Sequence, residues 1–89
     1  MPSILITGAS SGIGRATTQK FLNEGWHVGL LARRADKLSE IADGNQNAEI
    51  YAVDVTNRFA VDKAVSEFAK SCGRLDAIFN NAGVFPSGA

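Results

Sequence analysis

The segment Thr7-Gly8-Ala9-Ser10-Ser11-Gly12-Ile13-Gly14 decides the fold that we expect for this chain. It follows directly on a short, near-continuous apolar run, Ser3 to Thr7, which is typical of a strand buried on both faces. A helical pattern begins inside the segment, so its glycines lie in a tight strand-to-helix turn. Glycine suits such a turn because it accepts positive φ and lets a ligand approach the backbone. The free N–H groups at the start of the helix would then favour a pyrophosphate, the alternative being a tight turn without a ligand.

The spacing of the glycines separates this turn from two other nucleotide-binding loops. The phosphate loop of kinases and ATPases needs a second glycine five residues after the first, but that position is Ile13, and no lysine follows it. The Gly-x-Gly-x-x-Gly fingerprint fails as well, because the glycines here are Gly8, Gly12 and Gly14.

Strand-like and helical patterns alternate along the rest of the chain. The expected strands are residues 3–7, 27–32, 48–53 and 77–80, and the expected helices are residues 13–23, 35–42 and a third that Thr56 caps and Gly73 ends. In the first helix, the residues that share a side are Ile13, Ala16, Thr17 and Phe21. Near-continuous apolar strands separated by helices predict an α/β fold with a parallel sheet and covering helices.

Composition limits the class of protein. The 89 residues allow one small domain or a piece of a larger one, and 45% hydrophobic residues suffice for a packed core. Nine basic and nine acidic residues cancel, which argues against a nucleic-acid partner. No apolar run approaches the roughly 20 residues of a membrane helix, and the N-terminus does not resemble a signal peptide. The single cysteine rules out an internal disulfide and a multi-cysteine metal site, so we expect a soluble, cytoplasmic protein.

Three motifs together give the chain its resemblance to a known family. The pattern Thr-Gly-x-x-x-Gly-x-Gly at residues 7–14, the pair Asp54-Val55 and the run Asn80-Asn81-Ala82-Gly83 are similar to landmarks of the short-chain dehydrogenase/reductase family. The extended branch of that family would have glycine at Ser11, so the chain resembles the standard oxidoreductase branch. The resemblance implies a Rossmann-type doubly wound sheet with strand order 3-2-1-4, inferred from these motifs and from right-handed crossovers rather than from periodicity.

The same resemblance implies which residues bind a cofactor. In the family, the Asp-Val pair faces the adenine ring, the first Asn of the Asn-Asn-Ala-Gly run ties strands together, and the following residues line the cofactor ribose. Asp76 matches a position with a structural role. The cofactor-binding candidates are Gly8, Ala9, Ser10, Ser11, Gly12, Ile13, Gly14, Arg33, Arg34, Asp54, Val55, Asn81, Ala82 and Gly83.

The end of the second expected strand bears on coenzyme choice. An NAD site would usually have Asp or Glu there to bind the ribose 2′-hydroxyl, but this chain has Arg33 and Arg34. Two guanidiniums suit the 2′-phosphate of NADP(H). The alternative is that they are solvated at the start of the second helix; the choice is open for Arg34, and the family position favours a phosphate role for Arg33.

Two residues with reactive side chains have plainer interpretations. Cys72 lies on the apolar stripe of the third helix, as a small buried hydrophobe would, and no base is identifiable beside it. The only histidine, His27, begins the second strand, at the end opposite to the ligand-binding end of a parallel sheet. We therefore expect both to be structural, and we expect neither a catalytic residue nor a metal ligand in this chain.

The catalytic part of the family pattern is missing. Family members use a Tyr-x-x-x-Lys pair for proton transfer, but the single tyrosine, Tyr51, has Val55 four residues on. We therefore expect residues 1–89 to be one NAD(P)-binding segment of a longer, homo-oligomeric enzyme, which exchanges hydride with a carbonyl or alcohol, and to be inactive alone. Two alternatives stay open: a non-catalytic dinucleotide sensor, and a short gene product without activity.

Overall fold

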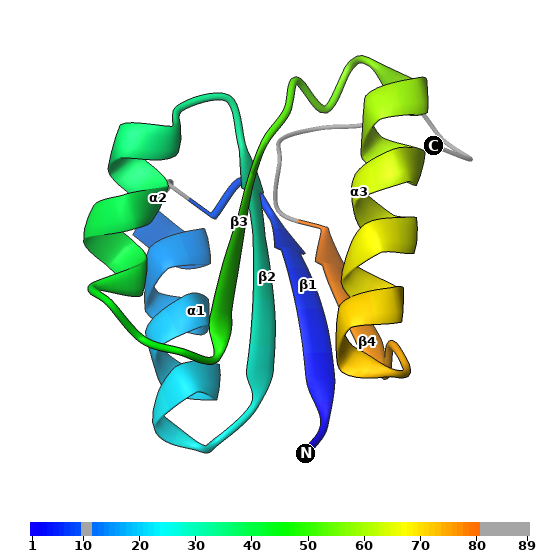
Figure 1. Ribbon diagram of the computed structural model, residues 1–89. Helices are drawn as coiled ribbons and strands as arrows, with labels where there is room; N and C mark the ends of the chain where they lie inside the picture. Colours follow the sequence, from blue (N-terminus) through cyan, green and yellow to red (C-terminus); the bar gives the residue numbers. More distant parts are fainter. Residues whose placement is uncertain (10–11, 81–89) are drawn as a thin grey trace.

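The computed structural model of the chain describes residues 1–9 and 12–80 and shows a regular alternation of strands and helices (Figure 1). Its elements in chain order are β1 (Ser3–Thr7), α1 (Gly12–Asn23), β2 (His27–Ala32), α2 (Ala35–Ala42), β3 (Ala48–Ala52), α3 (Arg58–Cys72) and β4 (Ala77–Asn80). The α/β class is therefore confirmed, and the expected elements differ from the observed ones by at most two residues at an end.

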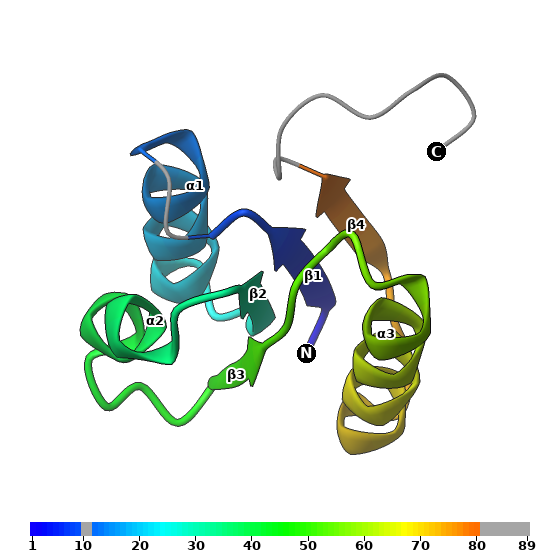
Figure 2. The same cartoon turned by 90° about the horizontal axis from the view of Figure 1, so that it is seen from above.

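The four strands form one parallel sheet in the order β3-β2-β1-β4, which confirms the expected topology. In the register of the sheet, Ile4 of β1 lies opposite Val28 of β2 and Ala77 of β4. Seen from above, α1 and α2 lie on one face of the sheet and α3 lies on the other (Figure 2). All strands run the same way, so Thr7, Ala32, Ala52 and Asn80 end them at one edge. We call this the carboxyl edge, and the opposite one, where the strands begin, the amino edge.

The face covered by α1 and α2 holds the larger core. Alternate residues of the two central strands point into it, and Leu38 and Ile41 of α2 close it. Its buried members are Ile4, Ile6, Ala9, Val28, Leu30, Ala32, Leu38, Ile41 and Ala42. This packing sets the direction of the strands and therefore of the chain where it leaves the carboxyl edge.

The face covered by α3 has a smaller core. Leu5 and Leu31 of the sheet pack against Ala64 and Phe68 of α3. A Cβ on Gly29 would lie 2.6 Å from Leu5 Cδ1 and 2.9 Å from Phe68 Cδ1, so the glycine is what lets the Phe68 ring approach the sheet. Close packing of this kind fixes how far α3 lies from the strands.

The buried side of α1 differs from the one that we expected. Its fully buried side chain is Thr18, whose hydroxyl donates to the carbonyl oxygen of Gly14 at 2.7 Å, whereas Ile13 is 66% exposed and Ala16 is exposed. The expectation holds for Phe21, which packs against the larger core. It was wrong for the first half of the helix, where Gly14 and Thr18 are the buried residues, because it considered only apolar side chains. A threonine can be buried in a helix when its hydroxyl bonds back to the carbonyl four residues earlier.

The start of α3 also needs a correction. Asn57, not Thr56, is the capping residue, and its Oδ1 accepts a hydrogen bond from the amide of Ala60 at 3.1 Å. Asn is as good a cap as Thr, and the actual boundary lies one residue further along the chain. The helix ends as expected, at Gly73 with φ of 84°, a left-handed conformation that glycine adopts without cost.

Candidate functional site

The turn between β1 and α1 is closely packed. Gly8 has φ of 63°, and the amide of the fully buried Ala9 donates to the carbonyl of Leu31 at 3.3 Å, which fixes the turn against β2. A Cβ on Gly14 would lie 2.3 Å from the carbonyl oxygen of Gly8, so only glycine allows α1 to begin this close to the turn. Two of the expected site residues here, Ser10 and Ser11, lie outside the described residues.

The outer side of the same turn is open. A Cβ on Gly12 would meet no atom within 4 Å, and the neighbouring Ile13 is exposed. The first turn of α1 therefore has room beside its backbone for a ligand. The positive dipole end of a helix suits a phosphate there.

The ends of β1 and β4 are tied by side chains. The Thr7 hydroxyl donates to Asn80 Oδ1 at 2.8 Å, and these two residues are also partners in the sheet register. Asn80 thus joins two strands, the role that the resemblance implied. The next residues of that motif, Asn81, Ala82 and Gly83, lie outside the described residues.

The two arginines after β2 have different partners. Arg33 Nη2 lies 3.4 Å from Asp54 Oδ2 across the carboxyl edge, and its side chain is 72% exposed. Arg34 stands at the N-cap position of α2 and pairs with Asp36 of the same helix, Nη2 to Oδ2 at 3.1 Å. The structure therefore brings Arg33, but not Arg34, to a second candidate residue.

The side chain of Asp54 is held in place by a local turn. Its Oδ1 accepts from the Thr56 amide at 2.9 Å and from the Thr56 hydroxyl at 2.7 Å. These bonds, with a smaller contribution from the Arg33 guanidinium, lower the pKa of Asp54. Val55, between them, is half-buried. Thr56 was missed as a site residue because we took it for a helix cap, although Asp-x-Thr is a known signal for such a turn.

The described part of the carboxyl edge thus offers a glycine turn, a helix start, an exposed guanidinium and a fixed carboxylate. These groups can hold a phosphate-bearing ligand through backbone donors and positive charge. Among the described residues at this edge, none is a tyrosine, lysine or histidine placed for proton transfer. The described groups at this edge can therefore bind a ligand.

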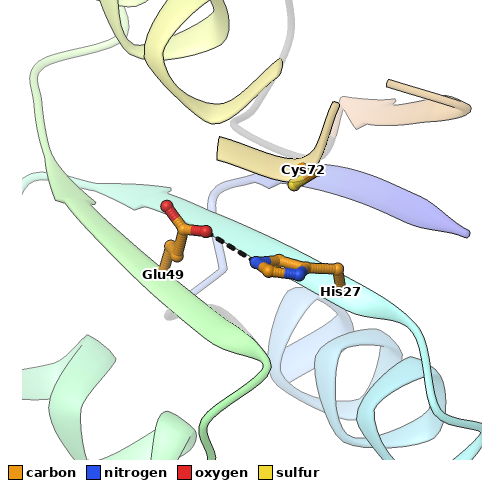
Figure 3. A group of neighbouring side chains, drawn as sticks. All are labelled: His27, Glu49 and Cys72. Atoms are coloured by element: carbon orange, nitrogen blue, oxygen red, sulfur yellow. Dashed lines mark hydrogen bonds and ion pairs between the residues drawn. The ribbon is translucent and has the colours of Figure 1, made fainter. Parts of the chain in front are cut away.

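His27 and Cys72, the two residues that we expected to be structural, lie far from this edge. His27 is at the beginning of β2, and Cys72 is in the last turn of α3. Glu49, near the beginning of β3, lies close to both of them (Figure 3). Cys72 is half-buried and packs beside the smaller core. Sequence reasoning could not find this group, because its members come from three separate elements.

No helix in the described ranges combines the length and the apolar character that a membrane span requires.

Comparison with known proteins agrees with the fold. A family model described as short chain dehydrogenase matches residues 2–89. The chain is 40% identical over 87 residues to 11-beta-hydroxysteroid dehydrogenase-like 3 of Arabidopsis thaliana, a match that covers 92% of this chain and 28% of that protein. It is 33% identical over 82 residues to NADP-dependent 3-hydroxy acid dehydrogenase YdfG of Shigella flexneri, covering 91% of this chain and 33% of that one.

A solved structure has the same fold over most of this chain. The 3-ketoacyl-(acyl-carrier-protein) reductase of Brucella melitensis, complexed with NADH, superposes with a TM-score of 0.80 at 28% identity. The match covers 86% of this chain and 32% of that one. The chain thus spans about a third of the length of the relatives it matches.

Proposed function

The chain belongs to the short-chain dehydrogenase/reductase family, and from this premise we propose that its residues form the coenzyme-binding part of an NADP(H)-dependent oxidoreductase. The coenzyme supplies hydride exchange with a carbonyl or alcohol carbon. The chain's own contribution is to bind and orient it at the carboxyl edge.

The observation that carries the proposal is the weak, exposed ion pair between Arg33 and Asp54. The contact is long, at 3.4 Å, and both side chains are largely exposed, at 72% and 43%. An exposed ion pair of this kind is weak, so the guanidinium is free to turn to a stronger partner. A 2′-phosphate offers charge and several acceptors to a guanidinium, whereas NAD(H) offers only a hydroxyl at the same place.

Arg34 has a smaller part in the proposal. Its pair with Asp36 holds it at the start of α2, which supports the alternative that it is solvated there. We assign Arg33 the main contact with the phosphate.

The backbone of the glycine turn provides the second part of the site. Open space beside Gly12, next to the exposed start of α1, fits a pyrophosphate. We propose that the segment from Gly8 to Gly14 binds it, and that Asp54 and Val55 face the adenine. Asn81, Ala82 and Gly83 complete the proposed site along the ribose.

Relatives of both coenzyme types resemble this chain. The Shigella flexneri protein is named NADP-dependent, and the Brucella melitensis reductase was solved with NADH. The family alone therefore does not decide the coenzyme, and the proposal depends on Arg33.

The rest of the proposal concerns the whole protein. Because the chain spans about a third of its relatives and contains no Tyr-x-x-x-Lys pair, we propose that residues 1–89 are one segment of a longer single-domain enzyme and have no turnover alone. The single cysteine suits the reducing cytoplasm. We also propose that the full-length protein is a homo-oligomer, which light scattering would test. We propose that its substrate is a small carbonyl compound or alcohol, which substrate screening would test.

The decisive experiment titrates NADPH and NADH against the full-length protein and its Arg33→Asp variant at one ionic strength. We expect the variant to bind NADPH about tenfold more weakly, the lower end for a hydrogen bond to a charged group because the site is exposed, and to shift towards NADH. Lys20→Asp, which makes the same charge change at the far end of α1, is the control and should leave both affinities unchanged. Equal or tighter binding of NADH by the unchanged protein would refute the assignment of NADP(H).

A further inference from the structure

A cluster of three different side chains lies at the amino edge on the α3 side, remote from the glycine turn. It consists of His27 from β2, Glu49 from β3 and Cys72 from α3 (Figure 3). Each offers one potential ligand atom, and these atoms all lie within 4.8 Å of one another. His27 Nε2 is 2.6 Å from Glu49 Oε2.

The carboxylate of the cluster is fixed by two hydroxyl groups. Ser71 donates to Glu49 Oε2 at 2.6 Å, and Tyr51 donates to Glu49 Oε1 at 3.0 Å. Burial would raise the pKa of Glu49, but the hydrogen bonds from Ser71, His27 and Tyr51 outweigh it and lower that pKa. The carboxylate is therefore ionised at neutral pH, and hydrogen bonds of this kind orient carboxylates in protein metal sites.

We propose that His27, Glu49 and Cys72 bind a divalent transition-metal ion, with Zn²⁺ as the best fit. Zinc in proteins is bound by imidazole nitrogen, carboxylate oxygen and thiolate sulfur, whereas Mg²⁺ and Ca²⁺ prefer oxygen alone. Three protein ligands leave a fourth position for water.

The geometry requires only a small adjustment. Zinc lies about 2.0–2.3 Å from such ligand atoms, so in a tetrahedral site the atoms are roughly 3.5 Å apart. The widest present separation, up to 4.8 Å, would have to close by about an ångström, and the 2.6 Å contact between His27 Nε2 and Glu49 Oε2 would have to open by about as much when the ion replaces their hydrogen bond. Side-chain rotations at the three residues can supply movements of this size. His27 and Glu49 are 21% and 27% exposed, so an ion can reach them from solvent.

The charge around Cys72 is compatible with a cation. Burial, and then the negative charges of Glu49 and Asp76, raise the pKa of its thiol. A divalent ion reverses this balance, because it stabilises the thiolate and neutralises the carboxylate beside it. The Phe68 ring, 5.6 Å from the His27 ring and edge-on to it, limits where the imidazole can lie.

Cobalt is the first probe, because Co²⁺ bound by a thiolate has a sulfur-to-metal charge-transfer band. Metal-free full-length protein is titrated with Co²⁺, and the spectrum of the Cys72→Ser variant is subtracted, so that any other cysteine of the longer protein cancels. We expect a difference band that saturates at one equivalent. Identical spectra for the two proteins would overturn the proposal.

Zinc affinity gives the second readout, by competition of Zn²⁺ with a chromophoric chelator. His27→Gln, Glu49→Gln and Cys72→Ser should each weaken binding by at least about tenfold, the lower bound found for changes merely in the outer shell of metal sites. The matched control is Glu40→Gln on the exposed side of α2, which should bind like the unchanged protein. Equal affinity in all four variants, or no binding at all, would refute the site.

A thermal measurement separates ligand loss from misfolding. One equivalent of Zn²⁺ should raise the melting temperature of the unchanged protein and of Glu40→Gln, because a ligand that binds only the folded state stabilises it. It should not raise that of Cys72→Ala, whose circular dichroism without metal shows whether it is folded. An equal rise in folded Cys72→Ala would contradict the proposal.

Discussion

Each edge of the sheet has an aspartate whose pKa is lowered by hydrogen bonds, but the two aspartates are held very differently. At the carboxyl edge, Asp54 is 43% exposed and its arginine partner lies 3.4 Å away. At the amino edge, the side chain of Asp76 is 18% exposed, accepts from the backbone amide of Ser3 at 2.8 Å and pairs with Arg74 at 2.5 Å. The carboxylate of Asp76 holds β1 to the start of β4, whereas the carboxylate of Asp54 holds a guanidinium in an exposed contact that a ligand can replace.

This comparison separates stability from coenzyme binding. Substitutions at the amino edge should change the free energy of unfolding and leave coenzyme affinity alone. Substitutions of charged groups at the carboxyl edge should do the reverse. The glycine turn is the exception, because it both closes the fold and borders the proposed ligand.

Gly14→Ala should have the largest effect. Its Cβ would lie 2.3 Å from the Gly8 carbonyl oxygen and 2.9 Å from Ala9 Cα, and these backbone atoms cannot turn away. We expect the free energy of unfolding in urea to fall by about 1–3 kcal/mol, as for other overpacked sites. We also expect coenzyme binding to weaken by about tenfold or more, the factor that 1.4 kcal/mol gives.

Gly12→Ala is its control for stability. The added Cβ meets no atom within 4 Å, so unfolding should be unchanged or slightly more difficult. A loss of stability in Gly12→Ala equal to that in Gly14→Ala would show that the close approach of α1 to the turn is not the cause.

Ser3→Ala tests the amino edge. The Ser3 hydroxyl, in a fully buried residue, donates to the carbonyl of Arg74 at 2.5 Å. Its loss should lower the free energy of unfolding by about 1 kcal/mol without affecting coenzyme titration. Thr17→Ala, which removes an exposed hydroxyl on α1, should have a smaller effect, and a change in coenzyme affinity in Ser3→Ala would break the distinction between the edges.

Acid unfolding tests the second group at the amino edge. The Ser3 amide and, to a smaller extent, Arg74 lower the pKa of Asp76 below its ordinary value of 3.8. The charged form therefore stabilises the fold above that pH, and this contribution is lost as the pH falls through the lower, folded-state pKa. Asp76→Asn should lose less stability than the unchanged protein between about pH 5 and pH 2, and Asp62→Asn on α3 should behave like the unchanged protein.

Asp54→Asn should have the smallest effect. The amide oxygen can still accept from Thr56, so the turn remains, but Arg33 loses its anionic partner. We expect NADPH to bind severalfold more tightly relative to NADH, because Arg33 no longer exchanges one anion for another. The adenine that Asp54 is proposed to face is common to both coenzymes, so the readout is the ratio of the two affinities. The gain in this ratio should shrink at high salt, and an unchanged or lower ratio at low salt would show that the pair with Asp54 does not compete with the 2′-phosphate for Arg33.

The same contrast explains what the sequence could predict. The turn at residues 7–14 was predictable because glycine spacing acts locally, and the order of the strands followed from the resemblance of the motifs to a known family, within the limits that crossover handedness sets. The buried residues in the first half of α1 were not predictable, since Gly14 and Thr18 make their contacts through close approach and a back-bonded hydroxyl, whereas the apolar Phe21 further along the helix was predicted to face the core and does. The cluster of His27, Glu49 and Cys72 depends on how α3 lies on the sheet, and no spacing along the chain encodes that.

The position of β1 between β2 and β4 has a consequence for the order of folding. β1 finds β2 after a single helix, but it meets β4 only across 73 residues, the separation of Ser3 and Asp76. A closure about three times longer costs roughly 1 kcal/mol more in chain entropy, so β1, α1 and β2 should associate first. During synthesis the chain must extend past Asn80 before Thr7 can meet its partner. A nascent chain that ends before β4 should therefore hold a formed glycine turn but no complete pocket, and capture of the coenzyme should be among the last events of its folding.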